Sequence, residues 1–382
     1  MSFTLTSKLP QVGTTIFTVM SALAAEKNAI NLSQGFPDFQ CDAELLEMVN
    51  RAMMRGMNQY APMTGVPALR EGIANLIQAK YGATYHPESE ITVTSGATEA
   101  LFCAIMSVIR EGDEVIVIEP AYDSYLPAIQ LAGGTPVCVA LEYPSYKVNW
   151  DSVKRLVNGR TRMIIINTPN NPTGSILREE DILQLEKLIS TNNICVLSDE
   201  VYEHIIFDRE PHESIARYPN LREKSFIISS FGKTFHVTGW KVGYCVAPEY
   251  MMKEFRKVHQ FVTFSTSTPL QVGIAEYIHK WDKINALSLF YQQKRDYFLE
   301  LMRDTRFKPL QTSGTYFQLM SYEGISEEKD TDFAIRLTQE FGVAAIPVSA
   351  FYRKGEDNKV IRFCFAKENA TLERAAERLR RV

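Results

Sequence analysis

Residues 226–246 read FIISSFGKTFHVTGWKVGYCV, two apolar runs separated by a stretch in which Lys233 follows a glycine and lies among aromatic residues. The first run, residues 226–229, predicts a buried strand, and the second, residues 242–246, predicts another. Only a short segment punctuated by glycine and threonine separates them, which is too short for the crossover that parallel neighbours need. We therefore expect the second strand to pair antiparallel.

Lys233 has aromatic rings and hydroxyl groups as sequence neighbours and no adjacent carboxylate. Apolar surroundings lower the pKa of a lysine from about 10.4 toward the neutral, nucleophilic amine. Neutral lysines form Schiff bases with carbonyls, including pyridoxal 5'-phosphate (PLP). The segment taken alone fits equally well a lysine on a half-buried surface that extends its ammonium group to water.

Upstream of residue 226, short apolar runs alternate with amphipathic helical patterns such as residues 99–110 and 179–191. The apolar runs are residues 91–94, 115–118, 136–140, 163–166 and 194–198. This alternation predicts an α/β fold with a mostly parallel sheet between two layers of helices. With the two strands of residues 226–246, the predicted sheet has seven strands, one of them antiparallel.

The C-terminal part of the sequence contains a separate set of predicted helices and strands. A long helical pattern covers residues 281–305, strands are predicted at 315–320, 343–347 and 359–366, and helices at 332–341 and 371–381. These elements predict a second, smaller α/β domain. We expect an N-terminal segment, residues 1–45, that packs with the small domain, a large cofactor-binding domain over 46–280, and the small domain over 281–382.

The composition restricts the class of protein. Of 382 residues, 45% are hydrophobic and 23% are charged, as in soluble globular enzymes. The formal charge of 41 − 45 = −4 and the lack of long basic runs argue against nucleic-acid or membrane partners. Six scattered cysteines and six dispersed histidines show no metal-ligand spacing, and no apolar leader opens the chain. We expect no metal site and a cytoplasmic protein.

Ligands of open α/β sheets bind beyond the carboxyl ends of the strands, so the residues after each strand are informative. Ala97 and Thr98 open a predicted helix after a glycine, which favours phosphate binding but is also found in ordinary β–α turns. Asp199 ends a strand so apolar that its carboxylate needs a cationic partner. The pyridinium nitrogen of PLP is one such partner; a helix cap or a structural ion pair is the alternative.

Two further positions could bind a substrate. Asn171 lies in the turn 167–174, where two prolines and a glycine can hold an amide at a fixed angle, with or without a cis bond before Pro172. Arg362 lies inside a predicted strand and offers a planar fork for a carboxylate, unless it faces water on an edge strand. PLP chemistry on an amino acid requires four features together: an amine, an anion that pairs with the pyridinium, a site that binds phosphate and a cation that binds a carboxylate.

The segment SSFGKTFHVTGWKVGY resembles the lysine signature of class I/II aminotransferases of PLP fold type I. Similar matches are NLSQGFPDF near residue 35, NQYAPMTGVPALR near 60, TVTSGATEAL near 95, NTPNNPTG near 170 and SDEVYEH near 200. The matches cover both predicted domains. Within the family, the chain resembles the kynurenine/glutamine transaminase branch, particularly its bacterial members that act on methionine.

This resemblance implies the roles of the cofactor-binding residues. Lys233 would form the Schiff base with PLP and move the proton, and Asp199 would pair with the pyridine nitrogen. Tyr202 and Asn171 would bond the phenolic oxygen, while Tyr122 would stack on the ring. Four residues would bind the phosphate: Ala97, Thr98, Ser230 and Lys241. Many relatives have arginine in place of Lys241, and a point charge replaces a bidentate fork there.

The resemblance also implies a substrate site and a homodimer with shared active sites. Arg362, helped by Asn171 and the backbone of Gly35, would hold the substrate carboxylate, and Tyr60 would reach the phosphate of the neighbouring subunit. Family positions of the side-chain pocket fall on Phe17, Tyr60, Tyr122, Phe264 and Ser265. Aromatic walls favour methionine, phenylalanine, tyrosine, histidine or glutamine over aspartate.

The implied reaction is ping-pong transamination from an amino acid to a 2-oxo acid. A cysteine-S-conjugate β-lyase is the alternative, because it shares the first half-reaction. A non-catalytic sensor on the same fold is a third hypothesis. Such sensors usually carry a DNA-binding segment, and we expect none before residue 30. The retention of Lys233, Asp199 and Arg362 together also argues against a sensor.

Overall fold

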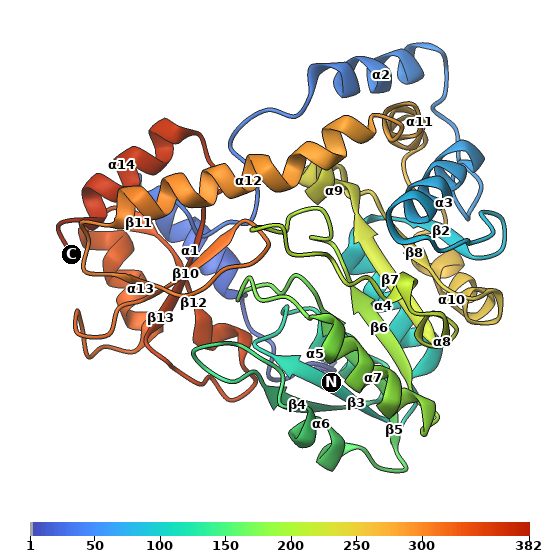
Figure 1. Ribbon diagram of the computed structural model, residues 1–382, viewed down its shortest axis with the longest axis horizontal. Coiled ribbons are helices and arrows are strands. Elements are labelled where there is room, and N and C mark those ends of the chain that lie inside the picture. Colours follow the sequence, from blue (N-terminus) through green and yellow to red (C-terminus); the bar gives the residue numbers. More distant parts are fainter. Residues whose placement is uncertain (1–2) are drawn as a thin grey trace.

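The computed structural model describes residues 3–382 and is built around a seven-stranded sheet (Figure 1). Its strands are β2 (Ile91–Thr94), β3 (Glu114–Glu119), β4 (Thr135–Ala140), β5 (Thr161–Asn167), β6 (Cys195–Asp199), β7 (Ser225–Ser230) and β8 (Gly243–Val246). Their spatial order is β2-β8-β7-β6-β5-β3-β4. Strand β8 pairs antiparallel with β7 and β2, and the other pairs are parallel. The predicted fold class and the antiparallel strand are confirmed.

Helices cover both faces of this sheet, because its central strands are apolar on both sides. One face packs against α4 (Gly96–Val108), α5 (Tyr125–Leu131) and α10 (Glu249–Val262). The other packs against α3 (Pro67–Tyr81), α6 (Trp150–Leu156), α7 (Glu179–Ser190), α8 (Pro219–Arg222) and α11 (Thr268–Tyr277). Helix α7 begins with three acidic residues, which suit the positive end of its dipole.

The C-terminal elements form a separate core around a four-stranded antiparallel sheet, ordered β12-β13-β10-β9. The strands are β9 (Lys308–Pro309), β10 (Phe317–Ser321), β12 (Ile346–Pro347) and β13 (Val360–Cys364). Helices α12 (Trp281–Met302), α13 (Asp330–Glu340) and α14 (Asn369–Leu379) accompany them. Figure 1 shows the long α12 running from α11 toward α14, between the two groups of elements.

The expectation of one strand over 343–347 is wrong. The structure breaks this run at Ala345 into two strands that belong to different sheets. Strand β11 (Val343–Ala344) pairs parallel with β1 (Ile30–Asn31), whereas β12 pairs antiparallel with β13. A continuous apolar run is buried throughout in both arrangements, so its hydrophobicity does not reveal that the chain changes partners.

The N-terminal segment contributes α1 (Ile16–Glu26) and β1, and both contact the C-terminal elements. Helix α2 (Ala43–Met54) packs instead on α11. The domain limits given above remain a prediction. None of the helices in residues 3–382 combines the length and the apolar character needed to cross a membrane.

Candidate active site

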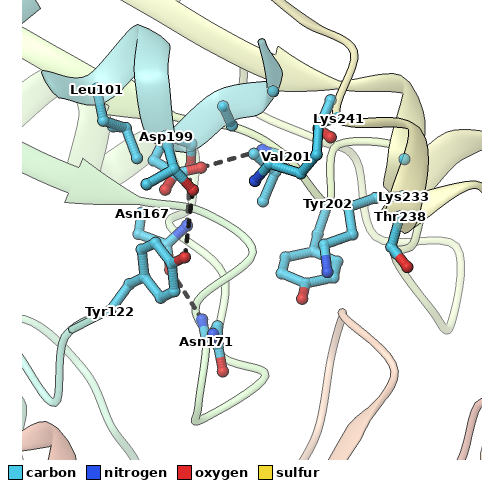
Figure 2. Close-up of a pocket in the computed structure, with 15 residues that line it drawn as sticks. Leu101, Tyr122, Asn167, Asn171, Asp199, Val201, Tyr202, Lys233, Thr238 and Lys241 are labelled. Atoms are coloured by element: carbon cyan, nitrogen blue, oxygen red, sulfur yellow. Dashed lines mark hydrogen bonds between the residues drawn. The ribbon is translucent and has the colours of Figure 1, made fainter. Parts of the chain in front are cut away.

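A cavity lies at the edge of the large sheet where β5, β6 and β7 end (Figure 2). Nine of the residues predicted from the sequence line it: Ala97, Thr98, Tyr122, Asn171, Asp199, Tyr202, Ser230, Lys233 and Lys241. Figure 2 shows Tyr122 and Asn171 on one side of the cavity, with Lys233 and Tyr202 on the other. The structure thus brings together residues that are up to 144 positions apart in the sequence, from Ala97 to Lys241.

Lys233 lies in the short helix α9 (Phe231–Thr234), directly after β7. Its Nζ donates to the carbonyl of Gly35 at 3.2 Å and to the hydroxyl of Tyr316 at 2.7 Å. The Tyr316 hydroxyl donates its own proton to the Gly35 carbonyl, so it can only accept from the lysine. Two N–H bonds of a neutral amine are satisfied in this way, and its lone pair is left for chemistry.

Burial lowers the pKa of Lys233 to about 8, and the positive charges of Arg362 and Lys241 act in the same direction. Cys364 and Asp199 oppose the shift. Lys233 therefore loses its proton more readily than an ordinary lysine, as a nucleophile or a proton acceptor requires.

Asp199 ends β6 with its carboxylate buried beneath the cavity. It accepts a hydrogen bond from the hydroxyl of Tyr125 at 2.6 Å and a longer one from the backbone N–H of Val201 at 3.3 Å. Burial raises the pKa of Asp199 to about 6, against the lowering effect of the Tyr125 hydroxyl. Within residues 3–382, no side-chain cation lies within ion-pair distance of this carboxylate, so it suits a cationic ring nitrogen placed in the cavity.

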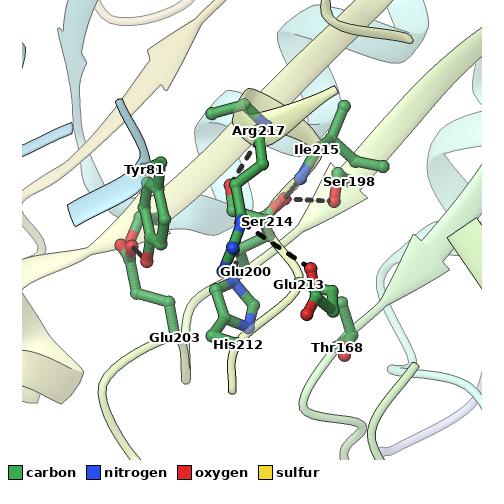
Figure 3. Close-up of polar contacts among 12 residues, drawn as sticks. Tyr81, Thr168, Ser198, Glu200, Glu203, His212, Glu213, Ser214, Ile215 and Arg217 are labelled. Carbon is green, nitrogen blue, oxygen red and sulfur yellow. Dashed lines mark hydrogen bonds and ion pairs between the residues drawn. The ribbon is translucent and has the colours of Figure 1, made fainter. Parts of the chain in front are cut away.

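Two further carboxylates, those of Glu200 and Glu203, fix the turn after Asp199 by hydrogen bonds to neighbouring elements (Figure 3). Glu203 accepts hydrogen bonds from three hydroxyls, those of Tyr81, Ser229 and Tyr244. Glu200 accepts from the Ser198 hydroxyl, the His212 ring and the backbone N–H of Ile215. Asp199, Val201 and Tyr202 of this turn therefore line the cavity, whereas Glu200 and Glu203 anchor it to neighbouring strands and loops.

Another part of the cavity lining favours an anion. The first turn of α4 begins at Gly96, which adopts a φ of +75°, and presents the backbone N–H groups of Ala97 and Thr98. Lys241 lies beside this turn: a Cβ on Gly96 would be 3.3 Å from its Nζ. A Cβ on Gly243 would lie 2.9 Å from the Ala97 nitrogen, so glycine is needed for this close approach. We call this group of residues 96–98, Ser230 and Lys241 the phosphate cup.

Arg362 is only 1% exposed and does not face water, because β13 lies between β12 and β10. Its guanidinium donates to the Asn171 side chain at 2.5 Å and to the Ser33 carbonyl at 2.9 Å. It packs against the ring of Phe317, with 3.8 Å between Cζ and the ring centroid. Burial lowers the pKa of Arg362 to about 10. The edge-strand alternative for this arginine is thereby wrong.

The remaining predicted residues lie outside the cavity lining. Phe17 stands 5.4 Å from the Arg362 guanidinium, and Gly35 meets Lys233 through its carbonyl. Tyr60 is 84% exposed and contacts Phe264 edge-on at 5.4 Å. Ser265 donates to the carbonyl of Ala61 at 3.0 Å. Tyr60 and Phe264 are thus separate from the cavity within one subunit, and the roles of all these residues remain predictions.

Sequence reasoning missed several residues of this site. The cavity is also lined by Gly96, Leu101, Asn167, Val201, Gly232 and Thr238, and Tyr125 and Tyr316 contact its charged groups. Asn167 was recognisable as the polar residue that ends an apolar strand: its side chain accepts from the Asn171 N–H at 2.8 Å and donates to the Asp199 carbonyl at 3.0 Å. Tyr125 and Tyr316 gave no signal, because buried tyrosines are common in cores.

The carboxylate, the phosphate cup and the lysine of this cavity together fit one cofactor, a phosphorylated pyridine aldehyde. The carboxylate without a cation suits its ring nitrogen, and the helix start beside an ammonium suits its phosphate. The fold and the site therefore define the class of protein: an enzyme that uses PLP.

This chain belongs to the family described as "Aminotransferase class I and II", which matches residues 27–379. It is 50% identical to methionine aminotransferase from Escherichia coli (strain K12), over 98% of both chains. Kynurenine–oxoglutarate transaminase from Dictyostelium discoideum is 34% identical, over 96% of this chain and 94% of that protein. The crystal structure of YbdL from Escherichia coli, whose description identifies a methionine aminotransferase function, superposes with a TM-score of 0.97 at 49% identity over all of both chains.

The protein is thus a PLP-dependent aminotransferase. When bound, PLP supplies an electron sink for the negative charge that proton removal leaves at Cα of an amino acid. Lys233, whose pKa burial lowers to about 8, would in its neutral form accept that proton at Nζ and return it, while Tyr316 and Gly35 hold its N–H bonds. The buried Asp199 would favour a positive ring nitrogen, and the N–H donors of Arg362 would suit a carboxylate.

Proposed function

We propose that this aminotransferase takes methionine, and also aromatic and glutamine-like amino acids, as amino donors for a 2-oxo acid in a ping-pong reaction. The observation that carries the proposal is the 50% identity to a methionine aminotransferase along the whole chain. The aromatic ring of Tyr122 in the cavity and that of Phe17 beside Arg362 supply apolar surface for an uncharged side chain.

The test is a panel of amino donors and 2-oxo acid acceptors with purified, PLP-loaded protein. We expect the highest kcat/KM for methionine, lower values for phenylalanine, tyrosine, histidine and glutamine, and the lowest for aspartate. Aspartate as the best donor would overturn the substrate proposal. Pyruvate release from a cysteine S-conjugate, measured in parallel, tests the lyase reaction; pyruvate without any oxo acid from methionine would refute transamination as the main activity.

We also propose that the enzyme is a cytoplasmic homodimer with shared active sites. All six cysteines are free thiols, as suits a reducing compartment. Tyr60 and Phe261 are largely exposed, and such large side chains favour burial against a second copy. Subunits with Tyr60→Ala, mixed with subunits carrying Lys233→Ala, should regain activity, since each hybrid dimer contains one intact site. Mixing without any gain would refute the shared site.

A further inference from the structure

A buried histidine outside the cavity connects two parts of the proposed site. His259, on α10, is fully buried. Its Nδ1 lies 2.8 Å from Oε1 of Glu99, and its Nε2 lies 3.0 Å from the backbone carbonyl of Met63. Each ring nitrogen thus has a hydrogen-bond partner, one a side chain on α4 and the other the backbone before α3. Both ring nitrogens are therefore engaged, and the ring links the Glu99 side chain to the backbone of Met63.

On one side, the histidine acts on the phosphate cup. Glu99 belongs to the first turn of α4, and its second oxygen, Oε2, accepts the backbone N–H of Ser95 at 3.0 Å. Ser95 directly precedes the glycine that opens the cup. Cys103 donates to the same Oε1 that His259 contacts, at 2.8 Å. The orientation of this carboxylate, and with it the start of the helix, therefore depends on His259.

On the other side, the histidine holds the segment 60–65, which we call the Tyr60 segment. Its side chain binds this segment at Met63, and its own carbonyl accepts the backbone N–H of Phe264 at 3.0 Å. Phe264 in turn packs edge-on against Tyr60. One residue thus fixes the Tyr60 segment and its aromatic neighbour relative to the phosphate cup.

We propose that His259 is a positioning residue for PLP: through Glu99 it orders the phosphate cup of its own subunit, and through Met63 it places Tyr60 for the site of the partner subunit. The second half of this statement rests on the proposed dimer with shared sites. The first half concerns a single chain and stands without it.

The first test measures PLP binding to apoenzyme, by fluorescence, for His259→Gln. We expect the dissociation constant of PLP to rise about tenfold or more, the effect of losing one charge-assisted hydrogen bond. Cys103→Ala is the matched control, because it removes the other donor to the same Glu99 oxygen and leaves the link intact; its PLP affinity should stay within about twofold of the parent protein. Equal affinities of His259→Gln and the parent, or equal losses in both variants, would overturn the proposal.

Thermal unfolding of the apoenzymes separates positioning from general destabilisation. If His259→Gln does not fold, Glu99→Gln carries the same test, since it replaces the carboxylate that His259 contacts by an amide of the same size. We expect a folded Glu99→Gln apoenzyme with weakened PLP binding. A folded Glu99→Gln protein with unchanged affinity would overturn the proposal.

The second test uses hybrid dimers. One subunit carries both His259→Gln and Lys233→Ala, and its partner is the parent chain, so the only working lysine faces an intact cup and a Tyr60 segment from the variant subunit. We expect weaker PLP binding at this site, titrated by its visible absorbance, than in a hybrid with Lys233→Ala alone. Equal binding would overturn the effect on the partner. Failure of the Tyr60 and Lys233 mixing experiment would instead refute the shared site and leave the apoenzyme test intact.

Discussion

Replacing Arg362 by lysine should weaken the binding of substrates that carry a carboxylate and leave other ligands nearly unaffected. The guanidinium donates hydrogen bonds in two fixed directions, to the Asn171 side chain at 2.5 Å and to the Ser33 carbonyl at 2.9 Å, and it packs on the ring of Phe317. Lysine keeps the positive charge but has no planar fork, so one arm of a bidentate contact is lost.

The magnitude follows from that arm. A hydrogen bond to a charged group contributes about 1.5–3 kcal/mol, so at about 1.4 kcal/mol per factor of ten KM should rise roughly 10- to 140-fold. The assay compares Arg362→Lys with the parent enzyme, using the KM of methionine and the inhibition constant of the amine that lacks its carboxylate. Only the KM of methionine should change strongly.

A matched control is Arg295→Lys. Arg295 is also buried, packs its guanidinium 4.8 Å from the ring centroid of Phe207 and binds Asp208, but it lies away from the cavity. Its substitution should leave KM unchanged. If Arg362→Lys retained the parent KM for methionine, or lost affinity for the amine to the same extent, Arg362 would not be the carboxylate-binding residue.

Three other variants test the cofactor site. Lys233→Ala should abolish both turnover and the visible absorbance of bound PLP; turnover at the parent rate would refute its catalytic role. Tyr125→Phe removes a hydroxyl that lowers the pKa of Asp199, so that pKa should rise and the acid limb of the pH–rate profile should move to higher pH. An acid limb at the same pH would show that this hydroxyl does not act on the carboxylate. Gly243→Ala places a Cβ 2.9 Å from a backbone nitrogen of the phosphate cup and should weaken PLP binding about tenfold or more. Gly239→Ala, whose Cβ would meet nothing within 4 Å, should bind PLP normally, and equal affinity of both variants would contradict the close-approach argument.

The large sheet could be predicted because each of its strands contains a short apolar run, and five of them (β2, β3, β5, β6 and β7) end in a polar residue. The connection between β7 and β8 is short, and this predicted the antiparallel direction of β8, since a parallel strand would have needed a longer crossover. The break at Ala345 could not be predicted, because the choice of partner strand depends on β1, more than 300 residues earlier in the chain.

The site was predictable where the chemistry needs a charged or conformationally special residue at a strand end, as at Lys233 and Asp199. It was not predictable where an ordinary residue from a distant element completes the geometry. Tyr316 reads as one more core aromatic, and only the fold shows that its hydroxyl lies between Lys233 and Gly35. Likewise, the sequence gives no indication that the Tyr125 hydroxyl reaches Asp199.

The three hydroxyls around Glu203 have a consequence for sequence divergence. A change of Glu203 to an apolar residue would leave the hydroxyls of Tyr81, Ser229 and Tyr244 without an acceptor. Loss of any one hydroxyl would leave the carboxylate without one of its donors. A chain in which only some of these four residues are replaced would be less stable, whereas a chain in which all four are replaced would not be. Among homologous chains these four positions should therefore covary, being inherited or replaced as a block.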